Sequence, residues 1–104
     1  MRTFPKQLAT FREIVNRRGE TLRVLTWEQL VASAAQPVEH IEVESRRATI
    51  AVIVEPAGEK LRVVIQGFMK HKWFLGSSVA LDGFYKHRNG DVTPMAEEDF
   101  YAYD

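Results

Sequence analysis

The chain has 104 residues, which is enough for one hydrophobic core and too few for two ordinary ones. Its apolar fraction of 45% and charged fraction of 27% are typical of globular proteins and argue against a disordered or membrane-spanning chain. It contains no cysteine, so we expect no disulfide, no thiolate chemistry and a reducing, cytoplasmic location.

Net charge is zero, but the charges are sorted along the chain. Residues 58–89 carry six lysine or arginine side chains against two acidic ones, for a net charge of +4. Residues 90–104 carry five acidic side chains and no lysine or arginine. These two regions should attract each other within the chain or across a dimer, over a Debye length of about 8–10 Å. A free acidic tail would instead be a ligand for a basic partner.

The first element is predicted to be a helix that ends at Gly19. Pro5 suits a first helical turn, where its missing N–H costs nothing. Apolar residues then recur at helical spacing, and glycine favours the left-handed conformation that ends many helices. The apolar stripe consists of Leu8, Phe11, Ile14 and Val15.

A second helix is predicted over residues 27–36. Thr26 suits its N-cap, because Gln29 follows three residues later as in a capping box, and Pro37 should stop the helix. The preceding segment, residues 22–25, fits either a short strand or an early helical turn.

The middle of the chain changes to the periodicity of strands. Residues 40–44 alternate between polar and apolar, whereas residues 49–54 are uncharged and largely β-branched, which predicts a central strand buried on both faces. A turn at 56–59 should lead to a third strand over 61–68. Residues 68–78 are less regular, and Gly76 to Ser78 is interpreted as a turn.

A fourth strand is predicted over 79–88, followed by the strong hairpin signal Asn89-Gly90. Thr93-Pro94 with the acids after it indicates either a helix start or an acidic tail. The predicted fold is a single α+β domain over residues 1–104. Two N-terminal helices are expected to pack on a mostly antiparallel sheet of about four to five strands. A short C-terminal helix is an additional possibility.

Motifs of known chemistry are missing from the sequence. There is no glycine-rich phosphate loop, no H-E-x-x-H and no zinc spacing, so we expect no cofactor and no metal ion. Residues 76–80 have the outline of a nucleophile elbow, but a chain this short cannot build the required α/β sheet. His40, Glu42 and Glu44 share one strand face, yet residues two apart lie about 7 Å from each other, too far for one ion to bind all three. A solvated face is the simpler interpretation.

Basic and aromatic side chains are interleaved over residues 68–74, which we call the basic–aromatic segment. Cations can contact phosphates and exposed rings can stack on bases, so the segment suits a single-stranded nucleic acid. The alternative is that the rings cap the core while the lysines are solvated. The candidate binding residues are Phe68, Lys70, His71, Lys72, Trp73 and Phe74, with a second group formed by Tyr85, Lys86, His87 and Arg88.

The near-neutral isoelectric point, about 6.8, is low for a nucleic-acid-binding domain. A helix-turn-helix is also disfavoured, since residues 27–36 contain no lysine or arginine to contact phosphate or guanine.

By elimination, the leading hypothesis is a non-catalytic interaction or accessory domain, such as a bacterial regulatory or immunity-type module. Its partner would be another protein or a second copy in a homodimer, with no membrane involved. The first alternative is a nucleic-acid-binding domain that uses both basic and aromatic groups. The second is a small enzyme with a site around His40, His71 or His87, because histidine is a common general acid and base in catalysis.

Overall fold

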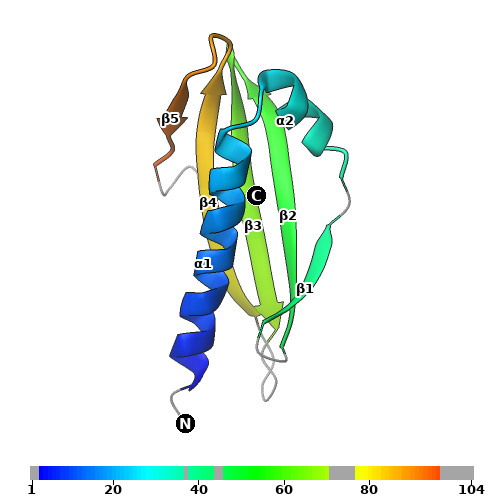
Figure 1. Ribbon diagram of the computed structural model, residues 1–104, viewed down its shortest axis with the longest axis vertical. Helices are drawn as coiled ribbons and strands as arrows, with labels where there is room; N and C mark the ends of the chain where they lie inside the picture. Colours follow the sequence, from blue (N-terminus) through cyan, green and yellow to red (C-terminus); the bar gives the residue numbers. More distant parts are fainter. Residues whose placement is uncertain (1–2, 37, 44–45, 71–76, 97–104) are drawn as a thin grey trace.

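A computed structural model describes residues 3–36, 38–43, 46–70 and 77–96 of the chain. Two helices, α1 (Thr3–Arg23) and α2 (Trp27–Ser33), precede five strands (Figure 1). The strands are β1 (Glu39–Val43), β2 (Arg46–Ala57), β3 (Lys60–Lys70), β4 (Ser77–His87) and β5 (Val92–Pro94). They form one sheet in the order β1-β2-β3-β4-β5, in which every neighbouring pair is antiparallel. The predicted α+β class, with N-terminal helices and an antiparallel sheet, is therefore confirmed.

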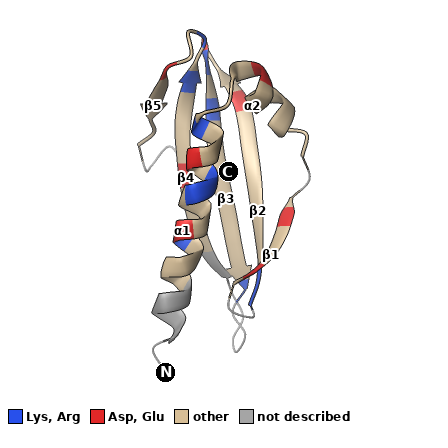
Figure 2. Cartoon of the chain, viewed as in Figure 1, with Lys and Arg blue, Asp and Glu red and all other residues tan. Residues whose placement is uncertain are grey.

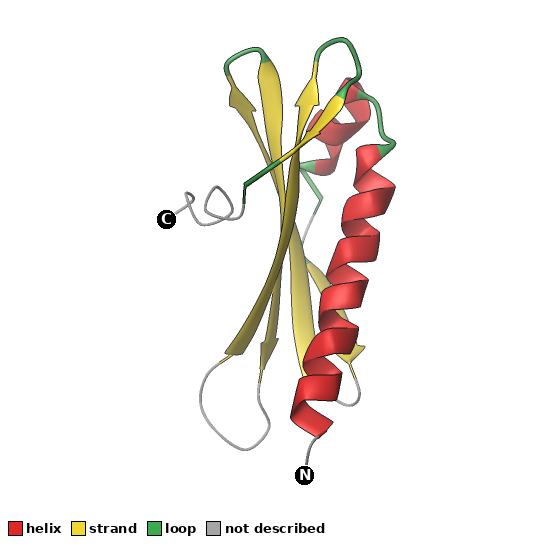
Figure 3. Ribbon diagram, turned by 90° about the vertical axis from the view of Figure 1, so that its left-hand side faces the viewer, coloured by secondary structure: helices red, strands yellow, loops and turns green. Residues whose placement is uncertain are grey.

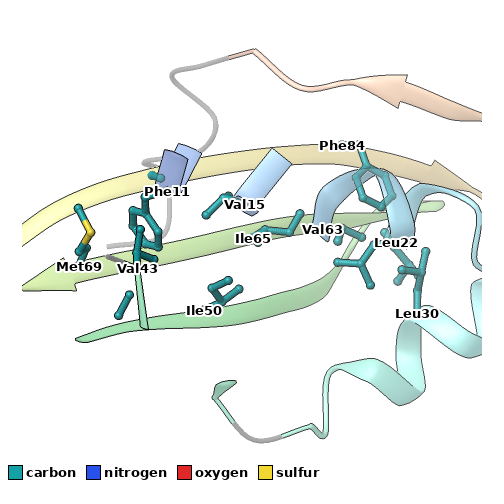
Figure 4. Packing of buried hydrophobic residues seen from close by; sticks show 13 residues of the cluster. Phe11, Val15, Leu22, Leu30, Val43, Ile50, Val63, Ile65, Met69 and Phe84 are labelled. Atoms are coloured by element: carbon teal, nitrogen blue, oxygen red, sulfur yellow. The ribbon is translucent and has the colours of Figure 1, made fainter. Parts of the chain in front are cut away.

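Helix α1 lies along one face of the sheet, which we call the helix face (Figure 3). Side chains alternate between the two faces of a strand, so every second residue of β2, β3 and β4 points toward α1. Figure 4 shows Phe11 and Val15 of α1 packed against this face beside Ile65. The buried cluster consists of Phe11, Val15, Leu22, Leu30, Val43, Ala48, Ile50, Leu61, Val63, Ile65, Met69, Ala80 and Phe84.

The strand buried on both faces is β3 rather than β2, contrary to the sequence prediction. Residues 61–65 are all buried, whereas most of residues 49–54 are only partly buried. The reason is the sheet order. β1 pairs only with residues 46–50 of β2, so residues 51–57 of β2 have no strand on their outer side among the described residues.

The prediction that the first helix ends at Gly19 is wrong, because α1 continues through this residue to Arg23. Gly19 is buried and lies beside the Asp82 side chain of β4. A Cβ atom on Gly19 would lie 2.0 Å from Oδ2 of Asp82 and 2.8 Å from Nη1 of Arg23. Glycine is therefore needed here for close approach and not as a helix stop. Leu22 and Arg23, left open between strand and helix, form the last turn of α1.

The sheet has a matching glycine opposite the middle of α1. A Cβ atom on Gly67 of β3 would lie 2.7 Å from Cζ of Phe11 and 2.9 Å from Cγ2 of Val15. Contacts this short are repulsive, so a side chain at Gly67 would have to displace Phe11 and Val15, and one at Gly19 would have to displace the Asp82 carboxylate and the Arg23 guanidinium.

Two arginines of α1 bind acidic side chains of the sheet. Arg23 donates to both carboxylate oxygens of Asp82 on β4, at 2.9 and 3.1 Å, and to the carbonyl of Gly83 at 3.2 Å. On the other side of the helix, Arg18 donates to both carboxylate oxygens of Glu39 on β1. The two ion pairs hold α1 across the width of the sheet.

Helix α2 begins as predicted and ends earlier. The Thr26 side chain accepts a hydrogen bond from the Gln29 amide at 3.1 Å, and the Gln29 side chain accepts one from the Thr26 amide at 2.9 Å. This is the expected capping box. The regular helix ends at Ser33 instead of Gln36, and its last carbonyls are used in tighter turns to Ala35 and Gln36.

Both predicted hairpin turns form, although their boundaries differ. The first is shorter than expected, because β2 continues to Ala57 and leaves Gly58 and Glu59 as the turn, with Gly58 at φ +70°. The second spans residues 88–90. Two backbone hydrogen bonds close this turn. The His87 amide donates to the Asp91 carbonyl, and the Gly90 amide donates to the His87 carbonyl.

Thr93 and Pro94 lie in β5 and do not start a helix. Pro94 pairs with Phe84 at the edge of the sheet, where a residue without an N–H is tolerated. Residues 97–104, which hold most of the acidic tail and of the optional C-terminal helix, lie outside the described residues. Among the described residues, no helix is both long and apolar enough to cross a membrane.

Gly19→Ala should destabilise the protein although alanine favours a helix. The added methyl group would collide with the Asp82 carboxylate, and overpacking of this kind costs about 1–3 kcal/mol. Asn16→Ala is the matched control, because Asn16 is exposed on the same helix and alanine there should stabilise by a few tenths of a kcal/mol. Urea unfolding of both variants checks this. A Gly19→Ala protein as stable as Asn16→Ala would show that the close approach is not tight.

Acidification should remove the contribution of the Arg18–Glu39 pair. The hydrogen bond from Arg18 lowers the pKa of the Glu39 carboxyl below its usual value. A carboxyl whose pKa is lower in the folded chain stabilises the fold above its unfolded pKa, about 4.3, and loses that effect as pH falls through the folded pKa. Both side chains are partly exposed, so the effect should be at most about 1 kcal/mol.

Glu39→Gln should lack this part of the pH dependence. Unfolding free energies of wild type and Glu39→Gln should differ at pH 7 and converge toward pH 3. A constant difference over this range would contradict the assignment.

Candidate binding surface on the open face of the sheet

The face of the sheet opposite α1, which we call the open face, carries a second set of side chains. The strand register places His40, Thr49, Phe68 and Val79 in one row across β1, β2, β3 and β4. Phe68 is 40% exposed and Val79 is 42% exposed, so two neighbouring apolar side chains face outward. Exposed apolar neighbours of this kind are typical of interaction sites.

This row borders a hollow of about 760 Å³, which we call the open-face hollow. It lies at the end of the sheet where β1 leads into β2 and β3 ends. Its described lining is His40, Ile41, Glu42, Arg47, Ala48, Thr49, Phe68 and Lys70. The residues of this lining that belong to the open face combine an aromatic ring with a hydroxyl, an imidazole and three charged groups.

The charged groups of the open-face hollow are available to a ligand. Figure 2 shows lysine and arginine near the ends of the strands, while the middle of β3 has no charged residue. Within the described part of the chain, no ion pair or side-chain hydrogen bond involves Arg47, Lys70 or Glu42. The described hollow therefore offers two cations and one anion around the Phe68 ring.

The sequence-predicted residues are divided between two ends of the sheet. Phe68 and Lys70 lie at the open-face hollow, whereas His71, Lys72, Trp73 and Phe74 lie outside the described residues. The second group begins at Tyr85, which pairs with Arg62, six residues along β3 from Phe68. Six strand residues span about 20 Å. The structure therefore does not bring the two groups into one surface.

Tyr85 and Lys86 make contacts within the protein. The ammonium nitrogen of Lys60 lies 4.1 Å from the centre of the Tyr85 ring, a cation–π contact. Lys86 points to the helix face, is buried, and donates from Nζ to the Gly90 carbonyl at 3.0 Å. Its charge therefore stabilises the turn between β4 and β5.

His87 and Arg88 are also engaged internally. Nε2 of His87 lies 2.9 Å from the hydroxyl of Thr93 on β5. The guanidinium of Arg88 lies 4.5 Å from the centre of the Trp27 ring, at the start of α2. These contacts join α2 and β5 to the hairpin, which gives the second group a structural role.

Sequence reasoning missed three residues of this surface: Arg47, Thr49 and Val79. Each follows from strand alternation once the neighbours of Phe68 are known, but the register that defines those neighbours is set by contacts between strands. His40 and Glu42 were placed on one strand face, and both line the hollow. Glu44, the third polar residue of that group, lies outside the described residues.

The described residues show no assembled catalytic or metal site. His40 and Glu42 both line the open-face hollow, but no hydrogen bond joins them. In the described ranges, no three His, Asp or Glu side chains are grouped so as to hold a metal ion. Ser77 begins β4 and is followed by strand, so the outline of a nucleophile elbow at 76–80 does not form one.

Comparisons with protein-family models, with curated proteins and with solved structures gave no match to this chain.

Proposed function

We propose that this protein is a non-catalytic interaction module that binds an acidic and apolar segment of a partner protein at the open-face hollow. The observation that carries the proposal is the exposed Phe68 ring at the rim of a hollow that also presents Arg47 and Lys70. A chain without cysteine suits a reducing compartment, and we place this activity in the cytoplasm.

The chemistry of the hollow favours this kind of ligand. An aromatic side chain in a concave, partly desolvated site is the usual energetic centre of a protein interface. Cations at the rim attract an acidic partner and increase its association rate more than its final affinity. Val79 beside Phe68 extends the apolar area that a partner would cover.

The charge balance favours a protein over a nucleic acid. Arg47 and Lys70 are offset by Glu42, which leaves one net positive charge on the described lining. Nucleic-acid binding depends on several phosphate contacts, each of which requires a cation. One net charge can steer an acidic peptide but is small for a phosphate backbone.

The test is a pull-down with full-length protein and a Phe68→Ala/Lys70→Glu variant. We expect partners of the wild type to be lost from this variant, with affinity for an identified partner falling at least about tenfold, or 1.4 kcal/mol. Val31→Ala/Arg12→Glu is the matched control, since it also removes an exposed apolar side chain and reverses a charge, on α1 and α2. Equal loss from both variants, or from neither, would count against the hollow.

A second measurement addresses the nucleic-acid alternative. Fluorescence anisotropy with a labelled single-stranded oligonucleotide should show no binding at physiological salt. If the wild type binds, if affinity falls steeply with salt, and if Phe68→Ala/Lys70→Glu abolishes binding, the surface recognises nucleic acid and the proposal is replaced.

A further inference from the structure

Most of the outer edge of β4 has no strand beside it in the described part of the chain. β5 pairs only with residues 84–86 of β4, while residues 77–83 pair with β3 on one side and with no described strand on the other. Figure 3 views the molecule from this side, with β5 crossing the upper part of the sheet. The open part of the edge, Ser77–Gly83, is called the β4 edge below.

The direction of the backbone groups on the β4 edge follows from the hairpin. The His87 amide donates to the Asp91 carbonyl on the β5 side. Backbone groups of successive strand residues point to opposite sides, so every second residue before His87 also points outward. The residues with outward N–H and C=O groups are Ser77, Val79, Leu81 and Gly83.

The β4 edge lacks the features that usually prevent strands from pairing between molecules. Residues 77–81 include no charged residue and no proline, and the carboxylate of Asp82 is held on the helix face by Arg23. The other edges differ, because β1 carries Glu39, His40 and Glu42 and β5 carries Pro94. Charges and proline at an edge block the addition of another strand.

We propose that a second copy of this chain occupies the β4 edge, with the two β4 strands antiparallel about Ala80, the middle of residues 77–83. The pairing gives one continuous sheet across a two-fold axis and satisfies the outward backbone groups of both copies. Val79 of each copy lies opposite Leu81 of the other, so exposed apolar surface beside Phe68 is covered. This inference concerns the backbone edge of β4, which shares Val79 with the candidate binding surface but no residue with the lining of the open-face hollow, and it does not rest on the proposed function.

A second copy fits this edge better than an unrelated charged strand. The edge is uncharged from 77 to 81 and the whole chain has zero net charge, so two copies meet without repulsion. Antiparallel pairing of identical strands is isologous and closed, so assembly stops at the dimer.

The test compares wild type with Val79→Lys by light scattering and sedimentation over a range of concentrations. We expect wild type to reach twice the chain mass of 12.0 kDa, and Val79→Lys to weaken dimerisation at least about tenfold. Each lysine would replace an apolar contact with Leu81 of the other copy, and the two lysines would lie diagonally across the axis and repel each other. Val79→Thr, which keeps the branched shape, should remain dimeric. Val38→Lys is the matched control. Val38 is similarly exposed, at 48%, but it precedes β1, which forms the opposite edge of the sheet.

A measurement on the wild type alone guards against misfolding of the variants. Hydrogen exchange at the Val79 and Leu81 amides should slow as protein concentration rises, while exposed amides elsewhere stay constant. A wild type that is monomeric at every concentration, or a dimer that Val79→Lys leaves unchanged, overturns the proposal. The Phe68→Ala/Lys70→Glu variant should lose its partner and still dimerise, so failure of one proposal is distinct from failure of the other.

Discussion

The rest of the structure depends on how α1 packs against β4, through the ion pair of Arg23 with Asp82 and the close contact at Gly19. Arg23 binds the Asp82 carboxylate with two hydrogen bonds, and Gly19 leaves room for that carboxylate beneath the helix. Asp82 is only 16% exposed, so loss of Arg23 would leave a charge in a largely dry site. The same two groups therefore define both the depth and the position of the helix.

This arrangement makes the two faces of the sheet chemically different. The helix face is filled by a single apolar cluster and by two arginine–carboxylate pairs. The open face keeps exposed Phe68 and Val79 together with charged residues at the ends of the strands. A ligand in the open-face hollow would contact side chains of β1, β2 and β3 directly, because the hollow is lined by residues of these strands.

Local signals in the sequence were sufficient to predict the α+β class of the fold. They were not sufficient to predict which residues form the open-face hollow. The capping box at Thr26 and the alternation around Ile41 are encoded within a few residues, and both were predicted correctly. Gly19 misled the prediction, because its role depends on Asp82, far away in the sequence. Pro94 was misread for a similar reason, since only pairing with β4 shows that it lies in an edge strand. The hollow likewise depends on register between strands, which no single segment specifies.

The order of the elements along the chain has a consequence for how the protein folds as it is synthesised. All strand pairs join consecutive strands, so the sheet can grow one hairpin at a time from local contacts. Helix α1 is different, because its ion pair to β4 joins residues 59 positions apart. Helix α1 is synthesised before the strands against which it packs. Its apolar side chains therefore cannot be buried until β3 and β4 have left the ribosome. During that interval Phe11 and Val15 lack the apolar surface that buries them in the fold, and exposed apolar surface of this kind favours aggregation of incompletely folded chains.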